Sequence, residues 1–476
     1  MWQENSRLAS GGRNARAGPR KVTVQTLTIL NESGTPDVLS PLCGLHALAG
    51  RLPDALLIVA GTRADVHLAQ SLSVPLPGAP ADPRDQNSGG YEVHPRVVFI
   101  VLEPDEEPSS GALASRVIEA AAGFRRTGLV LLVACRSVGL LGFDAGFEAE
   151  LAERRLGLPA RALLPDSDTG GILSTDLEDA AVRVLLDLSP SNVPEPEEER
   201  AYYSKGGLLG KLPLRSRPGR RTAGESGARR PVVLLGATPG PRRELAREFA
   251  RVGVEVAGGL PDAEDEWLPD IGERTVVAAM DPYLMRACGA AEERGAILAR
   301  SLFPIGVDGT ARFIQDVSAL AGLTTSEAGR ARQVWKGLDP LRNRIRGKRI
   351  FFTGDTGLEV PLARFLADAG AVVLEVGTPR LDRRSLAAEL STLGEDVDVV
   401  ESPDWRAQLA RIDAARPDVV VASPGLYVPL VALGHLCRSS RELLSLGVHG
   451  YEGARRVLEL FARTFEGAEK LDALNL

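Results

Sequence analysis

The chain has 476 residues, of which 44% are hydrophobic, and a formal net charge of -7. This length is too great for one compact core and predicts about three domains of roughly 150 residues each. The hydrophobic content excludes a disordered chain, and the acidic balance excludes the general basic footprint of a nucleic-acid-binding protein. No part of the sequence approaches the ~18 consecutive apolar residues that a membrane span needs.

The first 25 residues are expected to be disordered, because they are basic but contain no apolar segment of the kind found in secretory signals. The four cysteines are widely spread and form neither a disulfide framework nor a zinc-type pair. Cys288 and Cys437 lie in predicted helical surroundings without a partner nearby, which favours packing. This cysteine usage fits a reducing, cytoplasmic compartment.

Buried strands recur along the chain as short apolar runs that end in small or turn-forming residues. These runs do not alternate between polar and apolar residues, which is typical of strands buried on both faces of a parallel sheet. Amphipathic helices are predicted between them, for example over 242–251, 359–369 and 405–415. The alternation predicts three doubly wound, Rossmann-like α/β domains with parallel sheets. The predicted strands cover residues 55–61, 97–102, 129–134, 232–236, 275–279, 349–353, 371–375 and 418–422.

Two changes in composition divide the chain. Residues 191–230 are first rich in Pro and Glu and then in Arg and Gly, which predicts a linker or an insertion. A basic cluster just before the predicted strand at 349–353 marks the second boundary. We therefore expect a first α/β domain over 26–190, a second over 231–345 and a third over 346–476.

The sequence contains no standard motif for ATP or a dinucleotide. The nearest candidate for a phosphate-binding loop, residues 206–211, has the wrong spacing and no hydroxyl residue after its lysine. The turns at 236–240 and 354–357 also lack the dinucleotide fingerprint. If the reaction requires ATP, a partner protein is expected to supply it.

Three side chains are predicted to meet at the carboxyl edge of the first sheet, where open parallel sheets bind their ligands. Cys43 falls in the first turn of a helix that Ser40 can cap and Pro41 can start, where the helix dipole favours the thiolate. Asp65 and Cys135 each follow a buried strand. Two thiolates and a carboxylate could bind an iron–sulfur cluster. Alternatively, the cysteines are buried packing residues and Asp65 caps a helix.

The segments around these residues resemble a known family. Cys43-Gly-Leu-His-Ala-Leu48 and residues 52–70 are similar to the opening of the N subunit of light-independent (dark-operative) protochlorophyllide reductase, a nitrogenase-like reductase. The resemblance runs from about residue 38 to residue 463, with the predicted linker as an insertion. Further matching segments lie at residues 301–306, 358–366, 375–379 and 415–418 and at Gly447-Val-His-Gly-Tyr-Glu452.

The resemblance implies a nitrogenase component 1-like fold and a reductase activity. In the family, N and B subunits form an N2B2 heterotetramer, and a separate iron–sulfur ATPase, the L component, binds ATP-Mg and docks transiently to deliver electrons. A [4Fe-4S] cluster between N and B then reduces the C17=C18 double bond of protochlorophyllide, giving chlorophyllide for (bacterio)chlorophyll biosynthesis. Three N-subunit cysteines and one B-subunit aspartate hold that cluster. Cys43 and Cys135 match two of these cysteines, and Asp65 stands at the third position.

Several motifs depart from the family pattern. Residues 81–85 replace the corresponding family segment, and residues 174–179 keep only Glu178 and Asp179 of theirs. The motif around His449 lacks an aromatic residue. These changes bear on both the cluster and the tetrapyrrole pocket. His449 and Tyr451 are the candidate pocket residues, although His449, like His67, could instead be structural and Tyr451 could belong to a helix cap.

Three functions remain open at this stage. The chain could be a subunit of an ATP-dependent protochlorophyllide reductase, or of a related reductase that acts on another tetrapyrrole such as chlorophyllide. It could also be a non-catalytic scaffold or tetrapyrrole-binding paralogue, an alternative that the aspartate at position 65 favours. A doubly wound protein of glycosyltransferase type would require a nucleotide-sugar site, which the sequence does not reveal.

Overall fold

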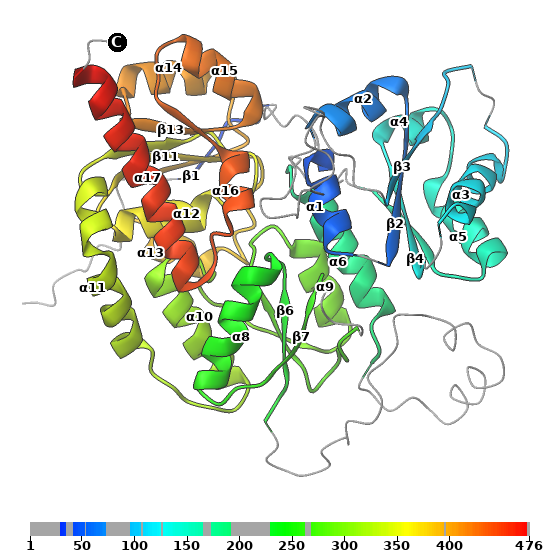
Figure 1. The fold of residues 1–476 in the computed structure, drawn as a ribbon, viewed down its shortest axis with the longest axis horizontal. Helices are drawn as coiled ribbons and strands as arrows, with labels where there is room; N and C mark the ends of the chain where they lie inside the picture. Colours follow the sequence, from blue (N-terminus) through cyan, green and yellow to red (C-terminus); the bar gives the residue numbers. More distant parts are fainter. Residues whose placement is uncertain are drawn as a thin grey trace, which may run out of the picture.

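The computed structural model describes residues 29–34, 41–52, 54–72, 96–105, 108–124, 127–164, 173–191, 229–261, 268–394 and 397–473. Within these residues the strands form three sheets in which every named pair of strands is parallel, and helices cover the sheets (Figure 1). The predicted fold class is therefore confirmed. The predicted disordered start, and all but the ends of the predicted linker at 191–230, lie outside the described residues.

The first sheet has the strand order β3-β2-β4-β5. Its central strands β2 and β4 are buried along their whole length, as expected for apolar runs with helices on both sides. Alternate residues of β2 face opposite cores: Leu56 and Ile58 pack with α3 and α5, whereas Leu57 and Val59 belong to the core that contains α1 and α6. The elements are α1 (Leu45–Gly50), β2 (Ala55–Gly61), α2 (Arg63–Leu72), β3 (Val97–Val101), α3 (Ala112–Ala122), β4 (Leu129–Ala134), α4 (Arg136–Leu140), α5 (Ala145–Leu156), β5 (Ala160–Leu163) and α6 (Asp176–Leu188).

The second sheet has the order β7-β6-β8-β9 and lies below the other two in Figure 1. Helix α6, the last of the first domain, joins it by packing against α9, where the buried Asp179 carboxylate accepts the backbone N–H groups of Arg286 and Ala287, each at 3.0 Å. This contact brings the start of α6 close to the ends of the second sheet. The elements are β6 (Val232–Leu235), α8 (Pro239–Arg251), β7 (Val256–Leu260), β8 (Val276–Ala279), α9 (Met285–Glu293), β9 (Ile297–Leu298), α10 (Val307–Leu320) and α11 (Ala328–Ile345).

The third sheet has six strands in the order β1-β12-β11-β10-β13-β14. The C-terminal helix α17 runs along this domain and packs against α11 and α8 of the second (Figure 1). The elements are β10 (Arg349–Phe352), α12 (Glu359–Asp368), β11 (Val372–Thr378), α13 (Ala387–Thr392), β12 (Asp398–Glu401), α14 (Trp405–Ala415), β13 (Val419–Ala422), α15 (Pro424–Ala432), β14 (Cys437–Ser439), α16 (Ser440–Leu446) and α17 (Gly450–Ala473).

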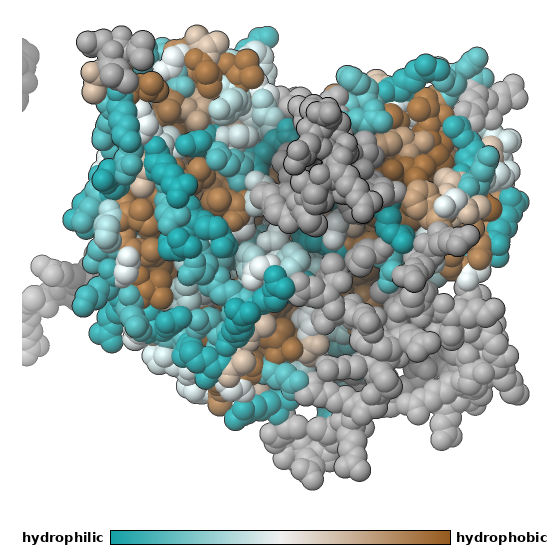
Figure 2. Space-filling view, in the orientation of Figure 1, coloured by the Kyte–Doolittle hydropathy of each residue, from teal (hydrophilic) through white to brown (hydrophobic). Residues whose placement is uncertain are grey.

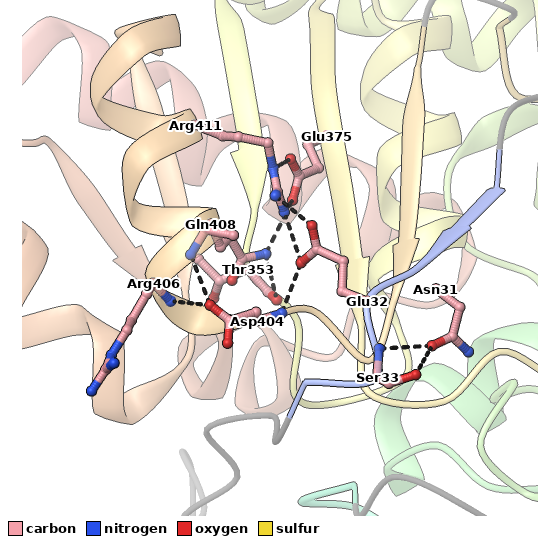
Figure 3. A network of polar contacts seen from close by, with 10 residues as sticks. Asn31, Glu32, Ser33, Thr353, Glu375, Asp404, Arg406, Gln408 and Arg411 are labelled. Carbon is pink, nitrogen blue, oxygen red and sulfur yellow. Dashed lines mark hydrogen bonds and ion pairs between the residues drawn. The ribbon is translucent and has the colours of Figure 1, made fainter.

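Strand β1 (Ile29–Asn31) corrects one predicted boundary, because it belongs to the third sheet and not to the expected first domain over 26–190. It pairs in parallel with Val399–Glu401, and the following residue, Glu32, anchors it. Arg411 donates to Glu32 Oε1 at 2.6 Å and to Glu375 Oε2 at 2.5 Å, so one guanidinium links β1 to α14 and β11 (Figure 3). A three-residue edge strand carries no apolar run, and its partner is distant in sequence, so local pattern could not place it.

The predicted position of Cys437 is also wrong. This cysteine lies in the short strand β14 and packs in a small core with α14 and α15. Helix α15 leaves apolar side chains exposed: Val428 is 69% exposed and Val431 is 49% exposed. Brown surface gathers over this region at the top of Figure 2. No helix among the described residues is both long enough and apolar enough to cross a membrane.

Candidate functional site

Asp65 and Cys135 lie together at the carboxyl ends of the two central strands of the first sheet. Asp65 is in the first turn of α2, just after β2, and Cys135 is the N-cap residue of α4, just after β4. A Cβ atom built on Gly61 would lie 2.9 Å from Asp65 Cβ and 3.0 Å from Cys135 Cβ, closer than side chains normally approach. Gly61 therefore leaves the space in which these two side chains meet.

One oxygen of the Asp65 carboxylate, Oδ2, accepts three hydrogen bonds. The donors are the backbone N–H and hydroxyl of Thr62, at 2.9 and 2.7 Å, and the hydroxyl of Ser137, at 2.5 Å. Thr62 Oγ1 accepts the Asp65 backbone N–H at 3.4 Å in return, which makes a capping box at the start of α2. Burial opposes ionisation, but the bonds from Ser137 and Thr62 outweigh it and lower the pKa of Asp65. Asp65 is thus an ionised carboxylate and a helix cap.

Cys43 lies in a 3-10 helix, η1 (Pro41–Gly44), that leads directly into α1. The segment contacts α2 and α6, but the Cys43 side chain is not among the described side chains. The structure therefore brings together the side chains of Asp65 and Cys135, and only the backbone of the third predicted ligand is placed. Among the described side chains, no group of three His, Cys, Asp or Glu residues is arranged to hold a metal ion.

A cavity of about 100 Å³ lies where the three domains meet. Its wall includes α1, the start of α6, the turns after β6 and β8, α16 and the segment between α16 and α17. Helix α1 connects the cavity to the first site, because Gly44, next to Cys43, lines the cavity together with Ala47 and Arg51. This volume holds a few water molecules, at ~30 Å³ each, or one substituent of a larger ligand.

A buried ion pair crosses the wall of the cavity. Arg51 Nη1 donates to Glu178 Oε1 at 2.8 Å and to the carbonyl oxygen of Ala237 at 3.1 Å, and the Tyr283 hydroxyl donates to Glu178 Oε2 at 3.2 Å. Burial disfavours the guanidinium charge, but the Glu178 carboxylate outweighs it and raises the pKa of Arg51. Burial, with the Asp281 and Glu178 carboxylates, also raises the pKa of Tyr283 well above its ordinary value. These contacts fix α1 and α6 to the second domain.

His449 and Asp281 form a second buried pair on the cavity wall. His449 Nε2 lies 2.7 Å from Asp281 Oδ1, and Asp281 Oδ2 accepts the Ala237 backbone N–H at 2.8 Å. Burial alone would raise the pKa of Asp281, but the His449 imidazole lowers it. An isolated antiparallel bridge with Ile305 holds the His449 backbone in place. His449 Nδ1 is buried and has no hydrogen-bond partner among the described residues.

The other candidate residues lie apart from the cavity. Tyr451 is buried against Arg330, whose guanidinium carbon lies 5.4 Å from the ring centroid, and it does not line the cavity. His67 is exposed on α2. Burial raises the pKa of Cys288 to about 12 and that of Cys437 to about 11, which fits packing residues.

Sequence reasoning missed Asp281, although a signal was present. Asp281 comes two residues after the buried strand β8, which is the placement that singled out Asp65. It also missed Arg51 and Tyr283, which carry no local signal because their partners are distant in sequence.

Two kinds of sequence comparison place the chain near the same proteins. Residues 210–466 match the family model of nitrogenase component 1 type oxidoreductases. Subunit N of the light-independent protochlorophyllide reductase of Heliobacterium modesticaldum is 31% identical over 447 residues, covering 91% of this chain and 95% of that protein. The Roseiflexus sp. subunit N is 41% identical over 247 residues, 52% of this chain and 59% of that protein.

The fold has solved relatives as well. A structure described as nitrogenase Cp1 at pH 6.5 superimposes with a TM-score of 0.62 at 14% identity and covers 94% of this chain and 96% of its own. At this identity the likeness concerns the fold alone. With the sequence matches, we conclude that the chain belongs to the subunit N family of light-independent protochlorophyllide reductases, within the nitrogenase component 1 type oxidoreductases.

Proposed function

We propose that the chain is the N-type subunit of an ATP-dependent reductase that converts protochlorophyllide to chlorophyllide by reducing the C17=C18 double bond. The observation that carries this proposal is the 31% identity to a protochlorophyllide reductase subunit across 91% of this chain and 95% of that relative. If the two proteins shared only one domain, the sequence identity would not extend over all three sheets of this chain. The protein would therefore work in (bacterio)chlorophyll biosynthesis, in the cytoplasm, as its cysteine usage suggests.

The family implies iron–sulfur chemistry, and the donor set at the first-sheet edge fits a cluster. Cys135 offers a thiolate beside the Asp65 carboxylate, and the segment that carries Cys43 packs against the Asp65 helix. Hydrogen bonds from neighbouring residues commonly hold a metal-binding side chain in the orientation that the metal requires. The bonds to Asp65 Oδ2 would do this for the Asp65 carboxylate, and none of them uses Oδ1, which could then bind iron. We assign Cys43, Asp65 and Cys135 as this chain's ligands to a [4Fe-4S] cluster shared with a B-type subunit. The cluster, when bound, would supply single electrons.

Other components would complete the complex. The sequence has no phosphate-binding loop of the standard kind, so ATP-Mg would bind a separate, transiently docking iron–sulfur ATPase, the L component. A B-type subunit would form the N2B2 heterotetramer and contribute the remaining cluster ligand.

The cavity at the three-domain junction is our proposed substrate site. Its volume of about 100 Å³ is too small for a whole tetrapyrrole, so one edge of the macrocycle would enter while the partner chain covers the rest. His449 lines this cavity, whereas Tyr451 lies behind the wall and would support it.

The ligand assignment is tested by the iron and acid-labile sulfide content of the complex purified anaerobically with its B-type partner. Asp65→Ala should lose most of the iron, whereas Asp65→Cys should retain it, because thiolates suit this metal better than carboxylates. Asp144→Ala is a matched control, since Asp144 also caps a helix of the first domain, accepting the Phe147 N–H at 3.0 Å, but lies outside the site.

The outcomes separate the candidate functions. Full iron in Asp65→Ala would remove Asp65 from the ligand set and leave it as the helix cap that the structure describes. An intact complex without iron in the unsubstituted protein would contradict the reductase and favour the scaffold or tetrapyrrole-binding paralogue.

A further inference from the structure

The Ser137 hydroxyl joins the two turns that carry Asp65 and Cys135 at the edge of the first sheet. We propose that Ser137 is a positioning residue for the [4Fe-4S] cluster: it holds Asp65 as a ligand through one oxygen and makes the reduction potential of the cluster less negative. This inference rests on the proposed function and deepens it, because it assigns a role in electron transfer to a residue that is not itself a ligand.

The direction of the Ser137 O–H bond is fixed by its two neighbours. Thr62 donates its backbone N–H to Ser137 Oγ at 3.2 Å, and Ser137 Oγ lies 2.5 Å from Asp65 Oδ2. An ionised carboxylate can only accept hydrogen bonds, so Ser137 must be the donor in the second contact. That distance is typical of a hydroxyl bonded to an ionised carboxylate, at about 2.5–2.7 Å. The Ser137 hydrogen therefore points at Asp65.

The same hydrogen bond links the turn after β4 to the turn after β2. Ser137 lies in α4, two residues after Cys135, and Asp65 lies in the first turn of α2. The Cys135 backbone N–H donates to the carbonyl oxygen of Ala60 at 2.9 Å, which fixes the Cys135 backbone to the end of β2. A shift of the Asp65 carboxylate away from Cys135 would therefore break the bond from Ser137.

The use of Oδ2 determines how Asp65 would bind iron. Oδ2 accepts the Ser137 hydroxyl and both donors of Thr62, and it lies 3.0 Å from the place of a Cβ atom on Gly61. A carboxylate oxygen has about two lone pairs, so three donors saturate Oδ2. Iron would therefore bind Asp65 through Oδ1 alone, with Oδ2 held at the end of β2.

The hydrogen bond from Ser137 also changes the charge that Asp65 presents. A hydroxyl donor draws negative charge from the carboxylate, and this favours the reduced cluster, which carries one more electron than the oxidised cluster. Hydrogen bonds and net charge around iron–sulfur clusters set their potentials in this way. Loss of the hydroxyl should shift the reduction equilibrium toward the oxidised form by roughly tenfold, or about 59 mV for a one-electron couple.

The test is a redox titration of the complex with its B-type partner, followed by electron paramagnetic resonance of the reduced cluster. Ser137→Ala should keep its iron, but its potential should be more negative and its resonance spectrum altered. Ser137→Thr keeps a hydroxyl and should restore the wild-type potential. Ser115→Ala is the matched control and should behave as wild type, since Ser115 also lies in the first domain but donates to the Gly111 carbonyl oxygen at 2.7 Å, outside the site.

The outcomes separate a positioning role from a purely structural one. A Ser137→Ala complex with the wild-type potential and spectrum would overturn the proposal, because loss of a helix-capping contact alone would lower Tm and change neither. If Ser137→Ala loses its iron, Ser137→Thr decides: iron at the wild-type potential supports the proposal, and loss of iron in both variants overturns it. An assembled wild-type complex without a cluster would instead overturn the proposed function itself.

Discussion

Gly61→Ala is the substitution that should disturb the first-sheet site most selectively. The added methyl group would lie 2.9 Å from Asp65 Cβ, 3.0 Å from Asp65 Oδ2 and 3.0 Å from Cys135 Cβ, so both side chains must move by several tenths of an ångström. The strand around Gly61 is fully buried, which leaves the methyl group no exit to solvent. Overpacking of this kind costs about 1–3 kcal/mol. At roughly 2–4 °C per kcal/mol for a domain of this size, Tm should fall by about 2 to 12 °C.

The assay measures Tm by scanning fluorimetry and iron by colorimetry on the complex purified with its partner. Iron should fall together with Tm, because the displaced residues are the proposed ligands. Gly139→Ala is the matched control, since a Cβ at Gly139, one turn beyond Cys135 in α4, would meet nothing within 4 Å. The reasoning is refuted if Gly61→Ala keeps both the iron content and the Tm of the control.

Three further predictions concern ionisable side chains that are buried or half-buried. Burial and the neighbouring Glu359 raise the pKa of Asp355 to about 7. The stabilisation from this proton uptake is fully present below the unfolded-state pKa of about 3.9 and is lost as pH rises through about 7. Asp355→Asn should therefore make Tm fall less steeply between these two pH values. Glu389→Gln breaks a buried pair with Arg364, whose Nε lies 2.5 Å from the carboxylate, and should lower the free energy of unfolding by about 3–5 kcal/mol in urea denaturation. Arg411→Ala removes the central guanidinium of Figure 3 and should speed hydrogen exchange in β1 while β13 stays protected.

Each of these predictions has a clear contrary result. An unchanged pH dependence in Asp355→Asn would mean that this carboxyl titrates normally in the folded protein. A stability loss below about 1 kcal/mol in Glu389→Gln would mean that the remaining contact of Arg364 with Asp368, at 3.2 Å, compensates the buried charge. Equal exchange of β1 in Arg411→Ala and wild type would show that backbone pairing alone holds this strand.

The sequence predicted those parts of the fold that local patterns determine. The central strands β2 and β4 are where their apolar runs place them, and α14 spans the predicted residues, with the Asp404 side chain accepting the N–H groups of Arg406 and Ala407 at its start. Edge strands such as β1 and β14 were missed, because three residues that are partly exposed carry no distinguishing pattern. Their position depends on the strand they pair with.

In the candidate site, too, only the features that follow from local sequence patterns could be predicted. A polar residue directly after a buried parallel strand identified Asp65 and Cys135, which the structure brings together. The capping box of Asp65 also follows from the Thr62 to Asp65 spacing. The cavity was not predictable, because Arg51, Asp281 and His449 come from three different domains and meet only through tertiary packing.

The most direct test of the account is chlorophyllide formation by the anaerobic complex of this chain with its B-type subunit, supplied with ATP-Mg and the iron–sulfur ATPase. The product is followed by its absorption after extraction, and a complex without the ATPase is the blank. We expect ATP-dependent loss of protochlorophyllide, matched by the formation of an equal amount of chlorophyllide. An assembled, iron-containing complex that binds protochlorophyllide and leaves it unreduced would contradict it.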